Sequence, residues 1–509
     1  MNETQRQQVR ENAKYLREVR PIEPEEINEY IEGTPHPAAV RQVLQEQAPE
    51  LGVIEREDGA FEPVDESPVS VRFDGVDELP EQLSRKVENL VIDRFGPGWP
   101  DGESGEQLRR LIRDFKERYL AGATVTYDEE TAVGYMLYHL SAYFAATQYV
   151  LADLLEDNLI PGHLRVLDVG AGVGGPALGL DALLPGDVLV EYHAVEPSDA
   201  TSVLTGLLET TGRNFHPTVH ATEIEAFDPD GAVKSPADES GVFDLVLFGN
   251  VLSELDDPAS VVKESLGWLT SDGTAMVLAP ADKNTAGQLR EVERTVEREV
   301  GASVYAPGVR LWQDEQPESE SWSFRRDNDL ITPSFQRQLD DGKRTVAERE
   351  AVTKGSSSEQ SKATDQHTTT DGRIQPAGSG EFVNVDVQYA YSLLRRDGQT
   401  AVDIRADRSR VAKLKETERH VTDRVDCLVL KLSHDLTEAG NPLYLVGDGS
   451  QKVDHFAVLT NETTLNNDIV SASYGSPLLM ENVLVLWNDD EQAYNLVIDE
   501  ETIIDRIPE

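Results

Sequence analysis

A cluster of four glycines follows an apolar segment and precedes a helix-like one, in the run Val166-Leu167-Asp168-Val169-Gly170-Ala171-Gly172-Val173-Gly174-Gly175-Pro176. Glycine lacks a Cβ, so its backbone can approach a ligand closely. Pro176 suits the first turn of a helix, because the N–H at that position would have no helical partner. The run therefore predicts a strand, a ligand-binding loop and a helix in succession.

Two acidic residues flank this loop in the sequence. Glu196 ends the next apolar run, 22 residues after Gly174, a spacing at which a carboxylate can accept both hydroxyl protons of a ribose. Asp168 stands two residues before Gly170, where its carboxylate could reach the ammonium group of a methionine-like ligand directly or through water. A pyrophosphate would be repelled by that charge.

A dinucleotide-binding Rossmann domain is the alternative. Gly170, Gly172 and Gly175 satisfy its G-x-G-x-x-G pattern, and the glycines alone do not decide between the two ligands. Asp168 favours a sulfonium nucleoside, and so does the segment 243–258, whose polar end would face the same crevice at the carboxyl ends of the strands.

The elements that must position these residues follow an alternating pattern. Short apolar runs at 164–169, 188–195, 219–221, 243–248 and 274–279 are separated by helical segments, and Leu289, Val292, Val296 and Val300 mark a further amphipathic helix. Such alternation predicts a parallel sheet with crossover helices. We expect an α/β domain over residues 126–340.

Together these segments resemble class I S-adenosylmethionine-dependent methyltransferases over roughly residues 160–300. The resemblance implies a Rossmann-like core with S-adenosylmethionine as cofactor. It also implies the site residues. The methionine end of the cofactor would contact Asp168, Gly170, Gly172 and Gly174, and the ribose would contact Glu196. The adenine would lie beside Glu223 and Ile224, after the third strand.

A narrower resemblance is to a methyltransferase-like family that acts in assembly of the small ribosomal subunit in bacteria and mitochondria. An aromatic helix before the glycine run and several short segments after it follow one another in the same order as in that family. The segments are 250–255, 278–280, 285–287, 304–307, 321–324 and 389–396. This resemblance implies the small ribosomal subunit or its RNA as partner.

Members of that family are reported to hold an iron–sulfur cluster near the Tyr-Ala-Pro and Trp segments, bound by cysteines. Gly308 and Ser323 stand there in this chain. We therefore expect neither an iron–sulfur cluster nor another metal, and we expect packing of Leu311, Trp312 and Trp322 to stabilise this region instead.

Methyl transfer requires alignment and desolvation more than a general base. Asn250 and Glu254, after the fourth strand, are the candidates for orienting the acceptor, although Asn250 could equally cap the following helix. The sole cysteine, Cys427, lies far outside the cofactor segment, so a covalent cysteine adduct is not expected. An Asn-Pro-Pro-aromatic motif for amino-group methylation is absent after the fourth strand.

Three further regions surround the methyltransferase domain. Residues 1–125 are predicted to be helical, and a helix followed by the Asp58-Gly59 turn could be a winged-helix-like element or an ordinary helix and hairpin. Residues 341–380 are predicted to be a disordered linker. Residues 381–509 are predicted to be β-rich, and an OB-like barrel is one interpretation.

Two helices carry side chains with alternative interpretations. The helix around 108–119 leaves Arg109, Arg110, Arg113 and Lys116 off its apolar stripe, either to bind phosphates or as an ordinary solvated face. The helix around 131–155 is rich in tyrosine, which indicates either core packing or a stacking platform.

The composition is strongly acidic, with 94 Asp and Glu against 46 Lys and Arg and a net charge of −48 in 509 residues. A hydrophobic content of 39% is too high for a wholly disordered chain, so the charge must cover folded domains. We interpret this as a surface adapted to high salt, with an acidic nucleic-acid mimic as the alternative. The polar amino terminus and the interrupted apolar stretches predict a cytoplasmic protein without a membrane span.

Three functions follow as hypotheses. The first is a methyltransferase acting on ribosomal RNA or a ribosomal protein. The second is a non-catalytic assembly factor that binds the cofactor as a structural ligand. The third is a small-molecule methyltransferase, for which the additional terminal regions are excessive.

Overall fold

The computed structural model describes residues 1–120, 125–233, 241–312, 315, 317, 323–342, 380–437 and 439–508. The chain forms two compact units. Unit 1 comprises Met1–Leu164, Asp168–Ser235 and Asn328–Val387, and unit 2 comprises Arg165–Leu167, Pro236–Asp327 and Gln388–Glu509. The predicted linker at 341–380 lies, apart from its ends, outside the described residues.

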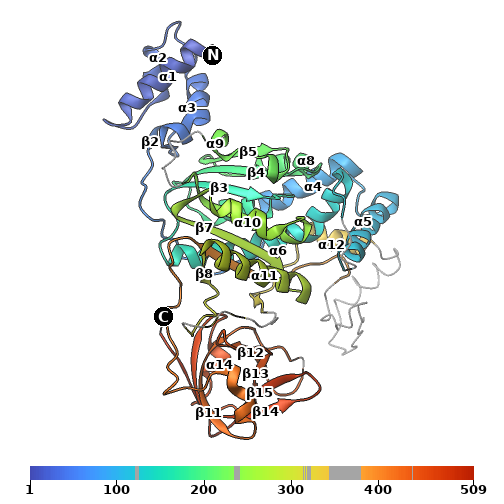
Figure 1. Cartoon of the computed structure of the whole chain (residues 1–509). Coiled ribbons are helices and arrows are strands. Elements are labelled where there is room, and N and C mark those ends of the chain that lie inside the picture. The colour runs from blue at the N-terminus through green and yellow to red at the C-terminus, as the bar shows by residue number, and fades with distance from the viewer. Residues whose placement is uncertain are drawn as a thin grey trace. The chain divides into compact units, whose positions relative to one another are not determined.

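Unit 1 begins with three helices and a hairpin: α1 (Glu3–Leu16), α2 (Pro24–Glu29), α3 (Pro37–Leu51), β1 (Val53–Glu55) and β2 (Phe61–Pro63) (Figure 1). The hairpin is antiparallel, and Ile22 forms an additional bridge to Phe61. Helix α3 ends at Gly52 in the left-handed conformation. Helices and a hairpin follow one another in this way in winged helices, and the winged-helix-like element stays a prediction.

The charges around α3 are paired within this element. Glu46 pairs with Arg6 and Glu50 with Arg10, both from α1. The buried carboxylate of Glu55 accepts from the Arg41 guanidinium. Helix α3 therefore does not present the basic surface by which a recognition helix approaches phosphates.

The remainder of unit 1 contains helices and strands. Its elements are α4 (Glu81–Phe95), α5 (Gly102–Leu120), α6 (Glu129–Glu156), α7 (Gly175–Leu183), β4 (Leu189–Val195), α8 (Ala200–Leu208), β5 (Phe215–His220), η1 (Ile224–Ala226), α9 (Pro229–Ala232) and α12 (Ser334–Gly342). Strand β3 (His163–Val169) has residues in both units, and the strand order within unit 1 is β5-β4-β3. Strands β4 and β5 are parallel.

Within unit 2 the strand order is β3-β6-β7-β10-β8, with β9 paired to β10. Its elements here are β6 (Phe243–Gly249), η2 (Leu252–Glu254), α10 (Pro258–Leu266), β7 (Leu269–Pro280), α11 (Lys283–Val300), β8 (Ser303–Ala306), β9 (Arg325–Arg326) and β10 (Gln388–Arg395). Strands β6 and β7 are parallel, whereas β10 is antiparallel to both β7 and β8.

The predicted α/β fold class is confirmed, because the five apolar runs fall in β3 to β7. One assignment was wrong. The segment that forms β10 was placed in the β-rich region starting at residue 381, but Tyr389 to Arg395 pair with β7. Seven of the eight residues of β10 are buried, as expected for an interior strand, and an apolar run does not reveal which sheet it joins.

The rest of unit 2 is a β-barrel, formed by β11 (Arg424–Lys431), β12 (Leu443–Gly447), β13 (His455–Leu459), α14 (Asp468–Ser471), β14 (Pro477–Asn488), β15 (Ala493–Ile498) and β16 (Ile503–Arg506). The strand order is β11-β12-β13-β15-β14, and pairing of β11 with β14 closes the barrel. Strands β13 and β15 are parallel. This is the strand order of an OB-fold, with a short helix between the third and fourth strands.

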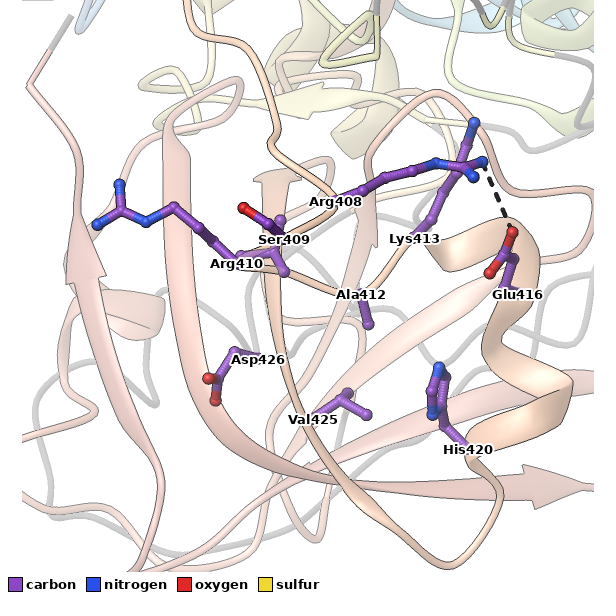
Figure 2. Close-up of a pocket in the computed structure, with 10 residues that line it drawn as sticks. Arg408, Ser409, Arg410, Ala412, Lys413, Glu416, His420, Val425 and Asp426 are labelled. Atoms are coloured by element: carbon purple, nitrogen blue, oxygen red, sulfur yellow. Dashed lines mark ion pairs between the residues drawn. The ribbon is translucent and has the colours of Figure 1, made fainter.

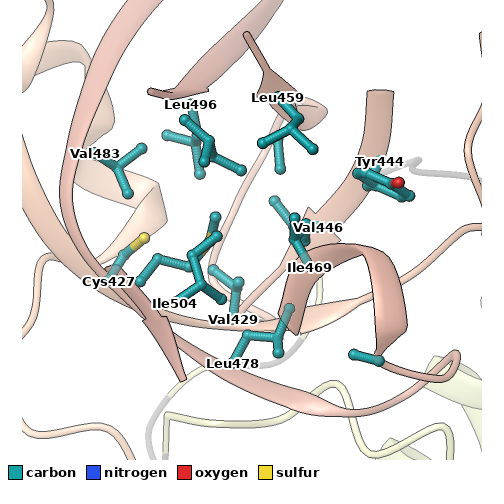
Figure 3. Close-up of a cluster of buried hydrophobic side chains, with 14 of the residues drawn as sticks. Cys427, Val429, Tyr444, Val446, Leu459, Ile469, Leu478, Val483, Leu496 and Ile504 are labelled. Carbon is teal, nitrogen blue, oxygen red and sulfur yellow. The ribbon is translucent and has the colours of Figure 1, made fainter. Parts of the chain in front are cut away.

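Apolar side chains fill the barrel. Cys427, Val429, Leu478, Val483 and Leu496 belong to one buried cluster and point into the interior (Figure 3). Burial raises the pKa of the Cys427 thiol, so this cysteine is a core residue and not a nucleophile. In the part of the chain that the structure describes, no helix has the length and apolar character needed to cross a membrane.

Candidate functional site

The glycine loop joins β3 to α7 in a conformation that requires glycine. Gly170, Gly172 and Gly174 have φ values of 65°, 53° and 86°, in the left-handed region that other residues rarely adopt. A Cβ on Gly174 would lie 2.6 Å from the Leu204 Cδ1 atom. The left-handed backbone at these three positions and the contact at Gly174 together explain why glycine is needed where the loop turns into α7.

Glu196 closes over this loop from the end of β4. Its Oε2 atom accepts from the Gly172 N–H at 2.8 Å, and its Oε1 atom accepts from the Ser198 N–H at 2.9 Å. Each carboxylate oxygen can accept a second hydrogen bond. The two hydrogen bonds hold the Glu196 carboxylate, which is 7% exposed, in one orientation. Each oxygen retains an acceptor site for one hydroxyl group of a ribose.

Asp168 is fully buried beneath the loop. The Tyr192 hydroxyl donates to its Oδ2 atom at 2.6 Å, while Oδ1 has no hydrogen-bond partner among the described residues. Burial raises the pKa of Asp168 to about 7, the charge of Glu196 adds to this rise, and the Tyr192 hydrogen bond opposes it. A buried carboxylate oxygen without a partner is costly. An ammonium group or a water molecule would satisfy it, so the residues fit the methionine end of the expected cofactor.

Tyr192 was not predicted from the sequence, although a signal for it existed. Side chains alternate between the two faces of a strand, so Tyr192 shares its face of β4 with Ala194. Its hydroxyl is thereby aimed at Asp168 of the neighbouring strand. A tyrosine four residues before Glu196 was the available indication.

Three half-buried rings on α6, which we call the aromatic stripe, lie one turn apart: Tyr135, His139 and Tyr143. The His139 ring stacks on Tyr143 with an interplanar angle of 3° at 5.3 Å, and it lies 4.7 Å from Tyr135. The Tyr143 Cβ would be 3.0 Å from a Cβ on Gly175. The stripe therefore extends to the glycine loop, within unit 1.

His139 is uncharged in this setting. Burial, together with the charge of Lys116, lowers the pKa of His139 to about 3. The Lys116 ammonium donates to the Tyr138 hydroxyl at 2.9 Å. The aromatic stripe consequently offers neutral rings at physiological pH.

The basic residues of α5 are engaged within unit 1. Arg109 is buried and donates to the carbonyl oxygens of Pro100 and Leu339, each at 3.0 Å. Arg113 donates to Glu381 at 2.6 Å, and Arg110 to the Glu106 carbonyl at 3.3 Å. These contacts replace the phosphate-binding interpretation with a structural one.

The predicted adenine neighbours follow β5. Ile224 is buried at the start of η1, and Glu223 is exposed just before it. Both belong to unit 1, as do Asp168, the three glycines and Glu196. A contact of Glu223 and Ile224 with adenine stays a prediction.

The predicted acceptor-orienting residues Asn250 and Glu254 lie in unit 2, after β6. Asn250 has a φ of 63°, and its N–H donates to the Leu278 carbonyl at 3.0 Å. Residue Val251 occupies the N-cap of η2, which has no side-chain cap, so the capping alternative for Asn250 was wrong. Asparagine tolerates a positive φ better than most residues, and Glu254 is exposed. Their role toward an acceptor stays a prediction.

The region around Gly308 and Ser323 is held by hydrogen bonds and packing within unit 2. The Ser323 hydroxyl lies 3.0 Å from the Tyr474 hydroxyl, and Trp312 Nε1 donates to Asp448 at 2.6 Å. Leu311 is buried, as expected for a packing residue, whereas Trp322 lies outside the described residues. Among the residues that are described, no group of three or more His, Cys, Asp or Glu side chains is arranged to hold a metal ion.

Three family models match parts of the chain. Residues 143–333 match a model described as a methyltransferase domain. Residues 6–57 and 415–507 match the N-terminal and C-terminal domains of a family described as a domain of unknown function, DUF8157. Among curated proteins, none matches this chain.

Solved structures of several methyltransferases are similar at low identity. The plantazolicin methyltransferase BpumL in complex with SAH is 11% identical, with 62% of this chain and 100% of that chain covered and a TM-score of 0.27. Magnesium protoporphyrin IX methyltransferase from Synechocystis PCC 6803 is 14% identical, with 43% of this chain and 87% of that chain covered and a TM-score of 0.24. A putative S-adenosyl-L-methionine-dependent methyltransferase from Methanococcus maripaludis is 13% identical, with 35% of this chain and 74% of that chain covered and a TM-score of 0.24.

The family model and the geometry around the glycine loop agree. The chain contains a methyltransferase domain with a Rossmann-like core, and S-adenosylmethionine is its cofactor. Within unit 1, the side chains that would hold this cofactor are those of Asp168 and Glu196, together with the glycine backbone between them.

Proposed function

We propose that this S-adenosylmethionine-dependent methyltransferase acts on RNA, and that its acceptor is RNA of the small ribosomal subunit. The observation that carries methyl transfer is the pair of carboxylates at the glycine loop, one set for a ribose and one with an unpartnered buried oxygen. The choice of RNA rests on the aromatic stripe, on the terminal domains and on the sequence resemblance described above.

S-adenosylmethionine, when bound, supplies a methyl group on a positively charged sulfur. The protein's contribution is to bind, orient and exclude water. Glu196 would hold the ribose end of this cofactor and Asp168 its ammonium end. Two such contacts would limit the motion of the bound cofactor relative to an acceptor.

The aromatic stripe supports a flat acceptor. An unstacked base of single-stranded RNA is commonly held by stacking on aromatic side chains, with a contribution of about 1–3 kcal/mol per base. The three rings of the stripe lie against one another and reach the glycine loop through Tyr143. His139 is uncharged at neutral pH. A base stacked on this stripe would lie beside the cofactor loop.

The terminal domains support a macromolecular acceptor. The barrel has the strand order of an OB-fold, an architecture that binds oligonucleotides in many proteins. A small-molecule acceptor would require neither this barrel nor the winged-helix-like element.

The test is transfer of radiolabelled methyl groups from S-adenosylmethionine to purified immature small ribosomal subunits. We expect label in the RNA fraction, and a large loss of that label in a His139→Ala variant that still binds S-adenosylhomocysteine. Label in the protein or small-molecule fraction alone would refute RNA as the acceptor.

A non-catalytic assembly factor is the second candidate. It is favoured by Asn250, whose identity the positive φ already explains, and by the exposure of Glu254. Saturable cofactor binding without transfer to any fraction, combined with co-sedimentation of the protein with small subunits, would establish this candidate instead.

A further inference from the structure

A short segment of the C-terminal region reverses the charge balance of the chain. Residues 405–420 contain six Lys and Arg residues and three acidic ones, whereas acidic residues outnumber basic ones by 94 to 46 in the whole sequence. The segment leads into β11 of the barrel and includes η3 (Leu414–His420). A local excess of positive charge in so acidic a protein indicates an anionic ligand.

This segment forms one wall of a pocket of about 360 Å³, within the range of small-ligand sites. The opposite wall comes from the start of β11. Figure 2 shows Arg408 and Arg410 extending in opposite directions from the chain around Ser409. Charged and polar residues that line the pocket include Arg408, Ser409, Arg410, Glu416, His420 and Asp426.

The acidic groups at this pocket are already engaged. Asp426 accepts from the Asn482 N–H at 2.8 Å. Glu416 pairs with Arg408 at 3.6 Å and with Arg419 at 3.1 Å. Asp407 accepts from the N–H and hydroxyl of Ser409, each at 2.9 Å. Asp426 and Asp407 are thus held by backbone or hydroxyl donors, whereas a ligand at Arg408 would have to displace Glu416 from that side chain.

Arg410 is the cation least compensated by this arrangement. It is exposed, and the charge that acts on it is that of Asp407, whose carboxylate accepts from Ser409. The Arg408 side chain is 65% exposed and holds Glu416 only loosely. Guanidinium groups present several donors in a planar fork that matches phosphate oxygens.

The backbone that carries these arginines is fixed to the barrel. The Ala412 N–H donates to the Asp426 carbonyl at 2.7 Å, and Ala412 forms a parallel bridge with Cys427. The N–H groups of Arg410 and Val411 donate to the Asp407 carbonyl at 2.9 and 3.0 Å. The pocket wall is therefore formed before any ligand arrives, which reduces the entropic cost of binding.

The usual ligand face of an OB-fold is covered in this protein. OB-folds commonly bind oligonucleotides on the face of their second and third strands, here β12 and β13. Leu445 and Phe456, on that outer face, pack against Val309, Val402 and Ile404. The segment that covers this face, with Val402 and Ile404, continues directly into Arg408 and Arg410. These two arginines therefore offer a basic surface next to the covered face.

We propose that this pocket binds the phosphate groups of single-stranded RNA, with Arg408 and Arg410 as the phosphate-contacting side chains. The choice of RNA over other phosphate compounds rests on the proposed function, whereas the phosphate chemistry rests on the pocket alone. The site would hold the RNA strand through its backbone and without base recognition.

The test is fluorescence anisotropy of a labelled oligouridine of about 12 nucleotides, a length suited to one OB domain, with the full chain at several KCl concentrations. We expect Arg410→Glu to weaken binding about tenfold and to reduce the slope of log K against log salt by about 0.7. Arg298→Glu is the matched control, because it makes the same charge change at an exposed site of α11. It should leave affinity and slope close to those of the parent protein.

Three results would overturn the proposal. They are absence of oligouridine binding at low salt, equal losses in Arg298→Glu and Arg410→Glu, and displacement of the oligomer by inorganic phosphate or uridine monophosphate at equal concentration. Arg408→Ala with Arg410→Ala provides a milder second variant. An unchanged near-ultraviolet circular dichroism spectrum verifies that the barrel is folded in each variant. Methyl transfer that fails while pocket-dependent RNA binding persists would refute the proposed function and leave the pocket assignment intact.

Discussion

Asp168 and Glu196 bracket the same glycine loop but have opposite surroundings. Glu196 accepts two backbone hydrogen bonds, whereas Asp168 has one side-chain donor and one unpartnered oxygen in a fully buried position. Burial disfavours a charged carboxylate and raises the pKa of Asp168. An ammonium group beside Asp168 would therefore stabilise its charged form.

Replacement of Glu196 by alanine should weaken binding of S-adenosylhomocysteine at least tenfold. The change removes the acceptor for both ribose hydroxyls and leaves the Gly172 and Ser198 N–H groups without their partner. Isothermal titration calorimetry measures the affinity, and Glu225→Ala, at an exposed position of η1, is the control. Equal affinities of the two variants would contradict the ribose assignment.

Cofactor affinity should rise by about tenfold from pH 6 to pH 8. The pKa of Asp168 is raised to about 7, so the carboxylate is largely protonated at pH 6 and largely charged at pH 8, while the ligand's ammonium stays charged. Only the charged carboxylate attracts that ammonium. The same raised pKa means that the contribution of Asp168 to folding stability decreases as the pH rises from about 4 to about 7.

Two variants isolate this effect. Asp168→Asn should abolish the pH dependence, and Tyr192→Phe should move its midpoint upward, because the lost hydrogen bond normally lowers the pKa of Asp168. Titrations at pH 6, 7 and 8 provide the readout. A pH dependence that persists in Asp168→Asn would assign the titration to another group.

Much of this site could be predicted at the residue scale. The sequence predicts that Asp168, the glycines and Glu196 lie close together, because they stand at the carboxyl ends of adjacent strands of the sheet. Tyr192 and the stacking of His139 on Tyr143 could not be predicted with the same security. Their roles depend on how α6 and β4 pack, and a tyrosine-rich helix is equally consistent with an ordinary core.

At the scale of elements, the start of α7 depends on Gly174. This residue is the N-cap of the helix with a φ of 86°, and an added Cβ would approach Leu204. Gly174→Ala should lower the free energy of unfolding by about 1–3 kcal/mol and weaken cofactor binding. Denaturant unfolding measures the first effect.

The control for this change is Gly186→Ala. Gly186 has no heavy atom within 4 Å of an added Cβ, so its substitution should change stability by less than about 0.5 kcal/mol. Equal stabilities of the two variants would show that the loop does not need its left-handed residues.

The strands show where sequence patterns reach their limit at this scale. The exposed strand β5 was recognised only at its end, since its burial pattern lacks a continuous apolar run. Strand β10 was recognised as a strand but assigned to the wrong sheet, because more than 80 residues separate it from β8. The barrel was predicted as one interpretation of a β-rich region, and its closure through β11 and β14 is a long-range pairing that local patterns do not encode.

At the scale of the whole molecule, the net charge of −48 dominates. Exposed carboxylates repel one another at low ionic strength, and the Debye length falls from about 10 Å at 0.1 M salt to about 3 Å at 1 M. We expect the Tm to rise continuously as KCl is increased from about 0.1 M to about 2 M, over the range in which screening removes this repulsion. Differential scanning calorimetry would measure the trend, and a constant or falling Tm would refute adaptation to high salt.

The central claim is that the glycine loop with Asp168 and Glu196 holds S-adenosylmethionine. Calorimetric titration of the full chain with S-adenosylmethionine, and separately with NAD, tests it most directly. The account predicts saturable binding of S-adenosylmethionine at one site per chain and no heat of binding for NAD. Binding of NAD together with no binding of S-adenosylmethionine would contradict it.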